Sequence, residues 1–377
     1  MGEKPGSDVE RLKKIAYWFV IIAAIIVFLI YFQNFLQPFV LALVIWYFIK
    51  EIRNLLGGIK IKGKGMPRWL RGTIALIIML AIIGSIGELL VSNIEQIIKQ
   101  IPRYNKIEEN FINELGQRIG MEDLASKIEE RMENINIGRF LSDTLNSLSS
   151  TIGNMVMIII YVVFLLIEEI IFASKIKIIS ETQDKYNRVK NLLDQINHSI
   201  NRYILMKTLV SISTGLMSYF ALIIIGVDFP VLWAFIIFLF NYIPYIGSLV
   251  ATLLPAVFAI FQFNNGWYFV YVFLAIEAIQ MLNGNYIEPR IMGKSLNLSP
   301  LVVVLSLTIW GAIWGVLGMI LSVPIMSVLT IIMAQFPSTK NIAIFLSETG
   351  NIESHIVKYE EKSPNKLNQF YNRLFKK

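Results

Sequence analysis

The sequence predicts an all-α membrane protein whose chain crosses the bilayer about six to eight times. Of its 377 residues 55% are hydrophobic and 16% are charged, whereas soluble globular chains carry about 25% charged residues. The mean hydropathy is +0.60, and the apolar residues gather in runs of about 18 or more, the length that a helix needs to cross hydrocarbon. Lys and Arg gather in the loops between these runs, so the net charge of +7 indicates membrane topology and no nucleic-acid partner.

The first two apolar runs predict two helices joined by a short turn. Residues 15–32 are almost uninterrupted apolar, too long for the core of a signal peptide, and no small-residue cleavage site follows them. Pro38 opens a second run at 39–49, and polar residues lie between the two runs. We therefore expect a helical hairpin across the bilayer with a tight polar turn at 33–37.

A basic loop follows at 50–71 and indicates the cytoplasmic side. It carries seven Lys or Arg against one acid, Glu51. Its glycine pairs lack the spacing of a phosphate-binding loop, and no Ser or Thr follows the lysine, so contact with anionic lipid is the better interpretation. Residues 73–90 then form a third span and complete an N-terminal membrane region at 1–90.

Residues 91–150 differ in character from the membrane runs around them. Apolar residues recur at helical spacing, as at Ile94, Ile97, Ile98 and Ile101, and acids outnumber bases. This pattern predicts an amphipathic helical insert outside the membrane. The insert is either a contact region for a membrane surface or other subunits, or a helical pair that covers its own apolar face.

Two further spans flank a second basic stretch. Residues 153–172 form a fourth span that ends at Glu168 and Glu169. These acids form a proton relay only if they face the bundle interior, and an interfacial position is the preferred interpretation. The basic stretch 175–202 is expected inside, and residues 203–227 form a fifth span.

Two long apolar stretches near the C-terminus are interrupted, 231–263 at 241–247 and 300–336 at 310–318. Proline removes a backbone donor and glycine permits a reversed dihedral angle, so each stretch is either one kinked span or a re-entrant hairpin. Broken helices at membrane depth favour a binding element, and a plain proline kink or a glycine packing face is the alternative. The residues expected to shape the breaks and hinges are Pro244, Gly247, Pro289, Gly293, Gly311, Gly315, Gly318 and Pro324.

Polar residues around these breaks suggest a pathway across the membrane. Glu277 lies in an apolar span, on one helical face with Gln280 and Gly284. At that position its carboxylate must be paired, protonated or in contact with water, unless the residue lies at the membrane interface. Glu288 either joins this pathway or pairs with Arg290 in a loop. The expected pathway residues are Asn241, Tyr242, Tyr245, Glu277, Gln280, Asn283, Asn285 and Glu288.

Two substrate classes fit these residues. Amides, hydroxyls and freed backbone groups suit a small polar solute. An exchanger of sodium, lithium or potassium for protons needs a carboxylate instead, for which Glu277 is the first candidate, with Glu288 and Asp228 behind it. A different class, a membrane scaffold that assembles partners through 91–150, has no need of two broken helices with clustered amides.

The sequence offers few groups for enzyme or metal chemistry. It has no Cys and two His, His198 and His355, which excludes disulfides, a thiolate site and an imidazole-rich metal centre. No nucleotide-binding loop is present, and no Ser/Lys, Asp/Asp or His/Glu pair stands at a workable spacing in the apolar segments. We therefore expect no enzyme activity, no cofactor and no metal site.

Four sequence blocks in the C-terminal half carry a family resemblance. They are NYIPYIG at 241–247, NYIEPRIMG at 285–293, LSPL at 298–301 and W-G-x-x-W-G-x-x-G-M-x-x-x-V-P at 310–324. In this order and spacing the chain resembles the autoinducer-2 exporter (AI-2E) family of bacterial and archaeal permeases. The likeness covers most of the chain.

The resemblance implies a multi-pass protein of the prokaryotic inner membrane that works without nucleotide hydrolysis. It implies export of autoinducer-2 or exchange of sodium or related cations for protons, and a homo-oligomer, with a pentamer expected. The family often carries a glutamate at the position of Asn283, so either Glu277 or Glu288 takes that role here or the coupling differs. We expect a transport core at 151–336, a polar tail at 337–377 and both termini in the cytoplasm.

Overall fold

The computed structural model describes residues 6–58, 60–61, 64–67, 69–89, 91–93, 96, 137–292 and 297–352, and the statements below concern these residues. The predicted insert lies outside them from 97 to 136. Gly293 and the tail beyond 352 also lie outside the described residues.

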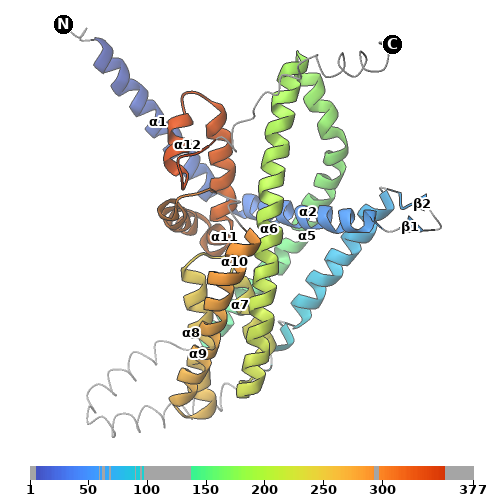
Figure 1. The fold of residues 1–377 in the computed structure, drawn as a ribbon, viewed down its shortest axis with the longest axis vertical. Helices are drawn as coiled ribbons and strands as arrows, with labels where there is room; N and C mark the ends of the chain where they lie inside the picture. Colours follow the sequence, from blue (N-terminus) through green and yellow to red (C-terminus); the bar gives the residue numbers. More distant parts are fainter. Residues whose placement is uncertain are drawn as a thin grey trace, which may run out of the picture.

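Helices make up nearly all of the described chain (Figure 1). Two strands of two residues each form a small antiparallel hairpin in the basic loop. The labelled elements are α1 (Gly6–Tyr31), α2 (Gln33–Gly57), β1 (Lys60–Ile61), β2 (Lys64–Gly65), α5 (Ile137–Ile179), α6 (Gln183–Ile225), α7 (Pro230–Phe240), α8 (Ile246–Phe263), α9 (Trp267–Leu282), the π-helix η1 (Asn283–Ile287), α10 (Glu288–Met292), α11 (Pro300–Gln335) and α12 (Lys340–Leu346). A helix without a label spans Trp69–Asn93.

The predicted all-α multi-pass class is confirmed. Seven helices among the described residues are long and apolar enough to cross a membrane. They are Gln33–Gly57, Trp69–Asn93, Met155–Ile179, Gln183–Ile225, Ile246–Phe263, Trp267–Ile291 and Pro300–Gln335. Within a helix the backbone groups satisfy one another, which lipid requires of any spanning segment.

The predicted polar turn between the first two helices is wrong. Residues 33–37 are helical, α1 ends at Tyr31, and Pro38 lies inside α2. From the junction at Phe32 the two helices run apart and do not form a tight hairpin (Figure 1). Gln is a good helix former, so the polar residues at 33–37 did not by themselves make a turn. Pro38 lies near the start of α2, where a proline removes one hydrogen bond without ending the helix.

Two long helices, α5 and α6, extend well beyond a single span. Each has 43 residues, which is about 65 Å at 1.5 Å per residue and about twice the thickness of the hydrocarbon core. The basic stretch 175–202 therefore lies mostly within these helices. Thr182 caps α6, because its hydroxyl accepts a hydrogen bond from the backbone N–H of Lys185.

Residues 230–263 form a helical hairpin, hereafter the first hairpin. Helix α7 has 11 residues, about 16 Å, which is too short to cross about 30 Å of hydrocarbon. Gln262 Oε1 accepts a hydrogen bond from the backbone N–H of Asp228 at 2.7 Å, and Gln262 Nε2 donates to Gly226 O at 2.8 Å. The end of α8 therefore lies beside the start of α7, and the chain reverses at 241–245, inside the predicted break.

Helix α11 is the second hairpin. Trp314 and Gly315 have non-helical backbone angles, and Gly315 has φ 61°, a region that favours glycine. Ser306 Oγ donates to Ser322 O at 3.1 Å, although the two are 16 residues apart and a continuous helix would separate them by about 24 Å. The choice between a kinked span and a hairpin is thus decided in favour of a hairpin for both interrupted stretches.

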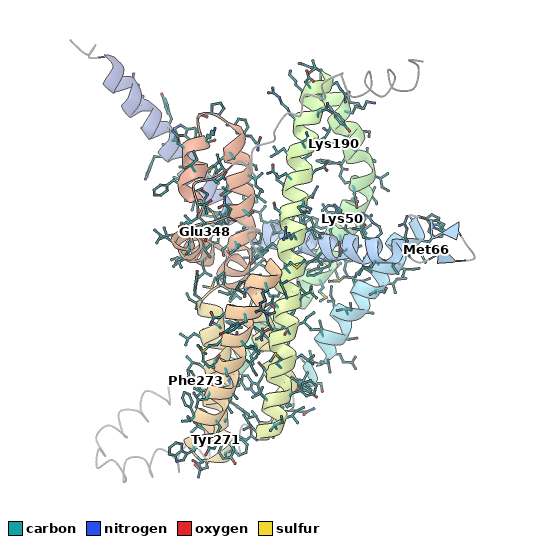
Figure 2. All side chains as sticks on the ribbon, viewed as in Figure 1. Lys50, Met66, Lys190, Tyr271, Phe273 and Glu348 are labelled. Atoms are coloured by element: carbon teal, nitrogen blue, oxygen red, sulfur yellow. The ribbon has the colours of Figure 1, made fainter. Side chains whose placement is uncertain are left out.

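A buried apolar cluster lies among α6, the first hairpin and α9. Its fully buried members include Leu222, Ile237, Ala251, Val272 and Ile276. Figure 2 shows Tyr271 and Phe273 in the lower part of the view, Lys50 near its middle and Lys190 in the upper part. Helix α9, which contributes Val272 and Ile276 to the apolar cluster, therefore lies toward the other end of the molecule from Lys190.

Candidate functional site

A cavity of about 630 Å³ lies where the tip of the first hairpin meets α6 and the continuous α9–η1–α10 helix. Six of the eight predicted pathway residues line it, and so do the predicted hinge residues Pro244 and Pro289. The six are Asn241, Tyr245, Glu277, Gln280, Asn285 and Glu288. The structure therefore brings together residues from two separate sequence blocks.

The residues around Glu288 are helical, so the predicted loop is wrong. After α9 the backbone continues through the π-helix η1 into α10 without leaving the helical region. A π-helical turn of this kind is rare and is frequent at functional sites. Glu277, Gln280 and Gly284, which were predicted to share one face, all line the cavity together with Glu288.

Glu288 forms an ion pair with a residue that the sequence analysis missed. Lys207 Nζ lies 2.6 Å from Glu288 Oε1, and the Lys207 side chain is 7% exposed. Glu288 therefore pairs with α6 and not with Arg290. A charge inside a membrane helix is costly and usually marks a function. The position of Lys207 within the predicted span 203–227 could therefore have identified it as a candidate functional residue from the sequence.

Three carboxylates of the described chain line the cavity, those of Glu277, Glu288 and the exposed Glu348, and Glu277 is the half-buried one without an ion pair. It is half-buried and forms no ion pair or hydrogen bond with any residue that the structure describes. Because Glu288 already has a cation beside it and Glu348 is exposed, Glu277 is the half-buried carboxylate that a cation, a proton or a donor group of a solute could meet.

Neutral polar groups complete the wall. The Asn241 amide donates to Ser211 Oγ at 3.0 Å, which fixes the hairpin tip against α6. Gln280 Nε2 and the Tyr203 hydroxyl are buried and have no hydrogen-bond partner in the described chain. Tyr203 was also missed by the sequence analysis, since a tyrosine at the start of an apolar run is equally typical of a membrane interface.

The hairpin tip is held by a γ-turn. Tyr245 has φ 62° and ψ −63°, and Ile246 N–H donates to Pro244 O at 2.7 Å. This turn is rare and strained. The Ser248 hydroxyl donates to Tyr245 O at 2.9 Å, so the next turn of α8 supports the strained residue.

Comparison with known proteins decides the family, because the AI-2E family transporter profile matches residues 19–338. The chain belongs to the AI-2E transporter family. It is 30% identical over 315 residues to the AI-2 transport protein TqsA of Escherichia coli strain K12. The aligned region covers 82% of this chain and 89% of TqsA. It is 32% identical over 270 residues to a protein of Borreliella burgdorferi that is named only for transport, covering 69% of this chain and 72% of that protein. The AI-2E match includes both hairpins and every helix that lines the cavity.

Two predicted pathway residues of this AI-2E protein face α6 and not the cavity. The Tyr242 hydroxyl lies 2.6 Å from Thr208 Oγ1, where either oxygen can donate. Asn283 is 1% exposed, its amide donates to Met217 Sδ of α6 at 3.6 Å and to Ile279 O at 3.0 Å, and its Oδ1 is buried without a hydrogen-bond partner in the described chain. Both side chains therefore contribute to packing of the AI-2E helices around the cavity.

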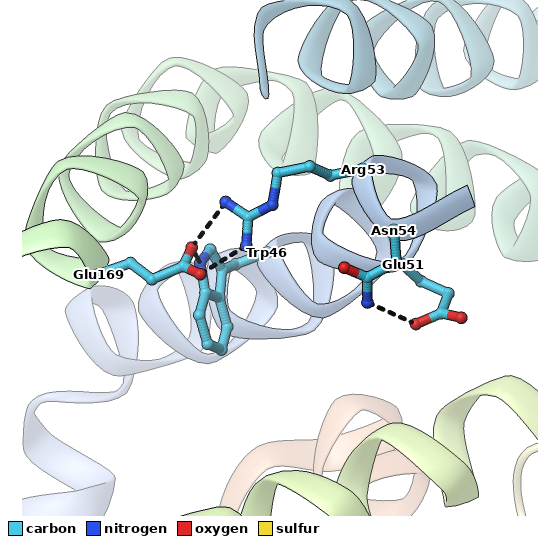
Figure 3. Close-up of polar contacts among 5 residues, drawn as sticks. All are labelled: Trp46, Glu51, Arg53, Asn54 and Glu169. Carbon is cyan, nitrogen blue, oxygen red and sulfur yellow. Dashed lines mark hydrogen bonds and ion pairs between the residues drawn. The ribbon is translucent and has the colours of Figure 1, made fainter. Parts of the chain in front are cut away.

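The acids at the end of the fourth span do not form a pair. Arg53 and the Trp46 indole both donate to Glu169, with 3.0 Å from Trp46 Nε1 to Glu169 Oε2 (Figure 3). Glu168 instead pairs with Lys175 on the same helix, at 2.7 Å. In this AI-2E chain Glu169 thus joins α5 to α2, and the proton-relay interpretation has no support from these contacts.

No group of three or more potential metal ligands occurs in the part of this AI-2E chain that the structure describes. The family consists of transporters and permeases. The wall of the cavity carries amide, hydroxyl and carboxylate groups.

Proposed function

We propose that this AI-2E protein exports a small polar solute by secondary transport, with AI-2 as the first candidate. The observation that carries the proposal is the pair of buried, unpartnered polar groups in the cavity wall, Gln280 Nε2 and the Tyr203 hydroxyl. A buried polar group without a partner costs about 1–3 kcal/mol, and a solute that hydrogen-bonds to it offsets that cost. The name of the relative TqsA supports AI-2 as the solute.

Efflux from liposomes tests this proposal. Purified protein is reconstituted into liposomes loaded with AI-2, and external AI-2 is followed for the parent, Gln280→Leu and Tyr203→Phe. Loss of one hydrogen bond from Gln280 to a buried solute should slow efflux about tenfold. Gln183→Leu is the matched control, because Gln183 is exposed at the start of α6 and far from the cavity lining. Equal efflux from Gln280→Leu and the parent would contradict the proposal.

Cation/proton antiport is the second candidate, and Glu277 favours it. A half-buried carboxylate without a partner in the described chain can bind a cation and a proton in turn, as an exchanger requires. The test uses liposomes with an internal pH-sensitive dye, an imposed pH gradient and added sodium, lithium or potassium. Collapse of the gradient that Glu277→Gln abolishes would establish exchange. No response from folded, oriented protein that still exports AI-2 would exclude it.

We further infer that both termini lie in the cytoplasm and that the protein forms a homo-oligomer, with a pentamer expected. The seven Lys or Arg of 50–71 support the orientation. Because the chain has no Cys, Ser180→Cys and Asn265→Cys each introduce a single thiol. In inside-out vesicles an impermeant maleimide should label the first and not the second, and native mass spectrometry gives the number of subunits.

A further inference from the structure

A second cavity, of about 980 Å³, lies between the end of α2, the first turns of helix Trp69–Asn93 and α5. Arg53, Asn54, Arg71 and Thr73 give it a polar end. Its remaining lining is mainly apolar. We propose that this cavity binds the phosphate of an anionic phospholipid, whose acyl chains lie along α5.

One of the two cavity arginines is already neutralised. Arg53 donates to both carboxylate oxygens of Glu169, with Arg53 Nη1 3.1 Å from Glu169 Oε2 (Figure 3). The Trp46 indole shares this carboxylate. Arg53 therefore contributes a fixed polar wall and little net charge.

Arg71 carries the uncompensated charge. It forms no ion pair in the part of the chain that the structure describes, and its Nε is buried without a hydrogen-bond partner there. Its guanidinium lies against Gly57, since a Cβ on that glycine would be 2.6 Å from Arg71 Nη1. Arg71 as a whole is half-buried, but its buried Nε–H has no acceptor in the described chain, which is destabilising, so an anionic oxygen from a ligand would stabilise it.

The location of Arg71 adds to its charge. Arg71 and Thr73 lie in the first turns of helix Trp69–Asn93, where the helix dipole favours an anion. The loop from 50 to 71 is rich in Lys and Arg, and such segments are attracted to the anionic lipid of the cytoplasmic leaflet at about 1 kcal/mol per residue.

The apolar wall distinguishes a lipid from a free phosphate ion. Leu76, Leu166, Ile167 and Ile170 line the cavity beside its polar end. Ile167 and Ile170 are 52% and 81% exposed on the candidate span Met155–Ile179. A ligand that fills both parts has a phosphate at one end and hydrocarbon at the other, as a phospholipid has.

Native mass spectrometry of the purified full chain tests the proposal. The protein is titrated with phosphatidylglycerol and with phosphatidylcholine of the same acyl chains, and the bound lipid is counted for the parent and for Arg71→Gln. Removing one basic contact should lower phosphatidylglycerol retention about fivefold, which corresponds to about 1 kcal/mol. Phosphatidylcholine retention should not change. Arg202→Gln, which removes an exposed charge outside this cavity, is the matched control and should retain phosphatidylglycerol as the parent does.

Several outcomes would overturn the proposal. The parent could retain the two lipids equally. Arg71→Gln could retain as much phosphatidylglycerol as the parent, or Arg202→Gln could lose as much phosphatidylglycerol as Arg71→Gln. Displacement of phosphatidylglycerol by an equal concentration of inorganic phosphate would indicate a site for the free ion. If Arg71→Gln does not elute as a single species, Gly57→Ala replaces it, because the added methyl group displaces the guanidinium and should lower retention at least threefold without removing a charge.

Discussion

The two hairpins reverse the chain by the same contact. A Cβ built on Gly247 would lie 1.9 Å from Phe240 O, and one built on Gly318 would lie 1.9 Å from Trp310 O. At each tip the returning helix therefore begins with its backbone pressed against the last carbonyl groups of the preceding helix, which only glycine permits.

The surroundings of the two tips differ. The first tip adjoins polar and charged residues of α6, and it carries Asn241 and Tyr245 to the cavity. At the second tip Trp310 and Trp314 pack together, with ring centroids 5.7 Å apart, and Trp314 Nε1 donates to Leu29 O of α1 at 3.1 Å. The reversal alone therefore does not make a binding site, and the polar groups of the neighbouring helix decide its chemistry.

The largest effect is expected from adding a methyl group at either tip. Gly247→Ala and Gly318→Ala should each lower the free energy of unfolding by about 4 kcal/mol or more, because the methyl group meets backbone and not a flexible side chain. Loss of monodisperse protein on gel filtration after a heating series measures this. Gly84→Ala is the control, since nothing lies within 4 Å of its Cβ position and Ala favours a helix. A destabilised Gly247→Ala beside an unaffected Gly318→Ala would show that the two tips are not equivalent.

The positions of both breaks could be predicted from the sequence, but the direction of the chain after them could not. Proline and glycine act locally, so Pro244, Gly247 and Gly315 marked the breaks. Whether the chain bends or returns depends on contacts between distant residues. The hydrogen bonds from Gln262 to Gly226 and from Ser306 to Ser322 are of this kind, and no local pattern encodes them.

The same limit applies to the cavity. Helical spacing placed Glu277, Gln280 and Gly284 on one face, and this face does line the cavity. It could not show which partner each polar residue meets, so Lys207, 81 residues from Glu288, was missed. Tyr242 and Asn283 were assigned to the pathway because they are polar, yet they contact Thr208 and Met217 of α6. Polarity alone does not show which side of a helix faces a cavity.

The next largest effect should come from the ion pair, which stands beside the first hairpin. Glu288→Gln leaves Lys207 buried without a counter-charge, so it should destabilise the protein by about 3 kcal/mol. The double variant Lys207→Met/Glu288→Gln removes both charges and should recover most of this loss. The midpoint of thermal unfolding of each protein in detergent measures the difference.

An exposed pair provides the control for this prediction. Lys185 and Glu181 are also in contact, but their side chains are 62% and 77% exposed. Glu181→Gln should therefore change stability by less than about 0.5 kcal/mol. If Glu288→Gln has an equally small effect, the buried pair contributes nothing particular to the first hairpin.

The smallest effect concerns the anchor of each tip and separates stability from transport. Trp314→Phe removes one hydrogen bond to Leu29 O, and Asn241→Leu removes one to Ser211, so each should cost about 1 kcal/mol of stability. Only Asn241 also lines the cavity. Asn241→Leu should therefore slow AI-2 efflux severalfold, whereas Trp314→Phe should leave the rate per folded molecule unchanged. An equal loss of efflux in both would mean that transport depends on movement of both hairpins, and the chemical difference between their tips would then be secondary.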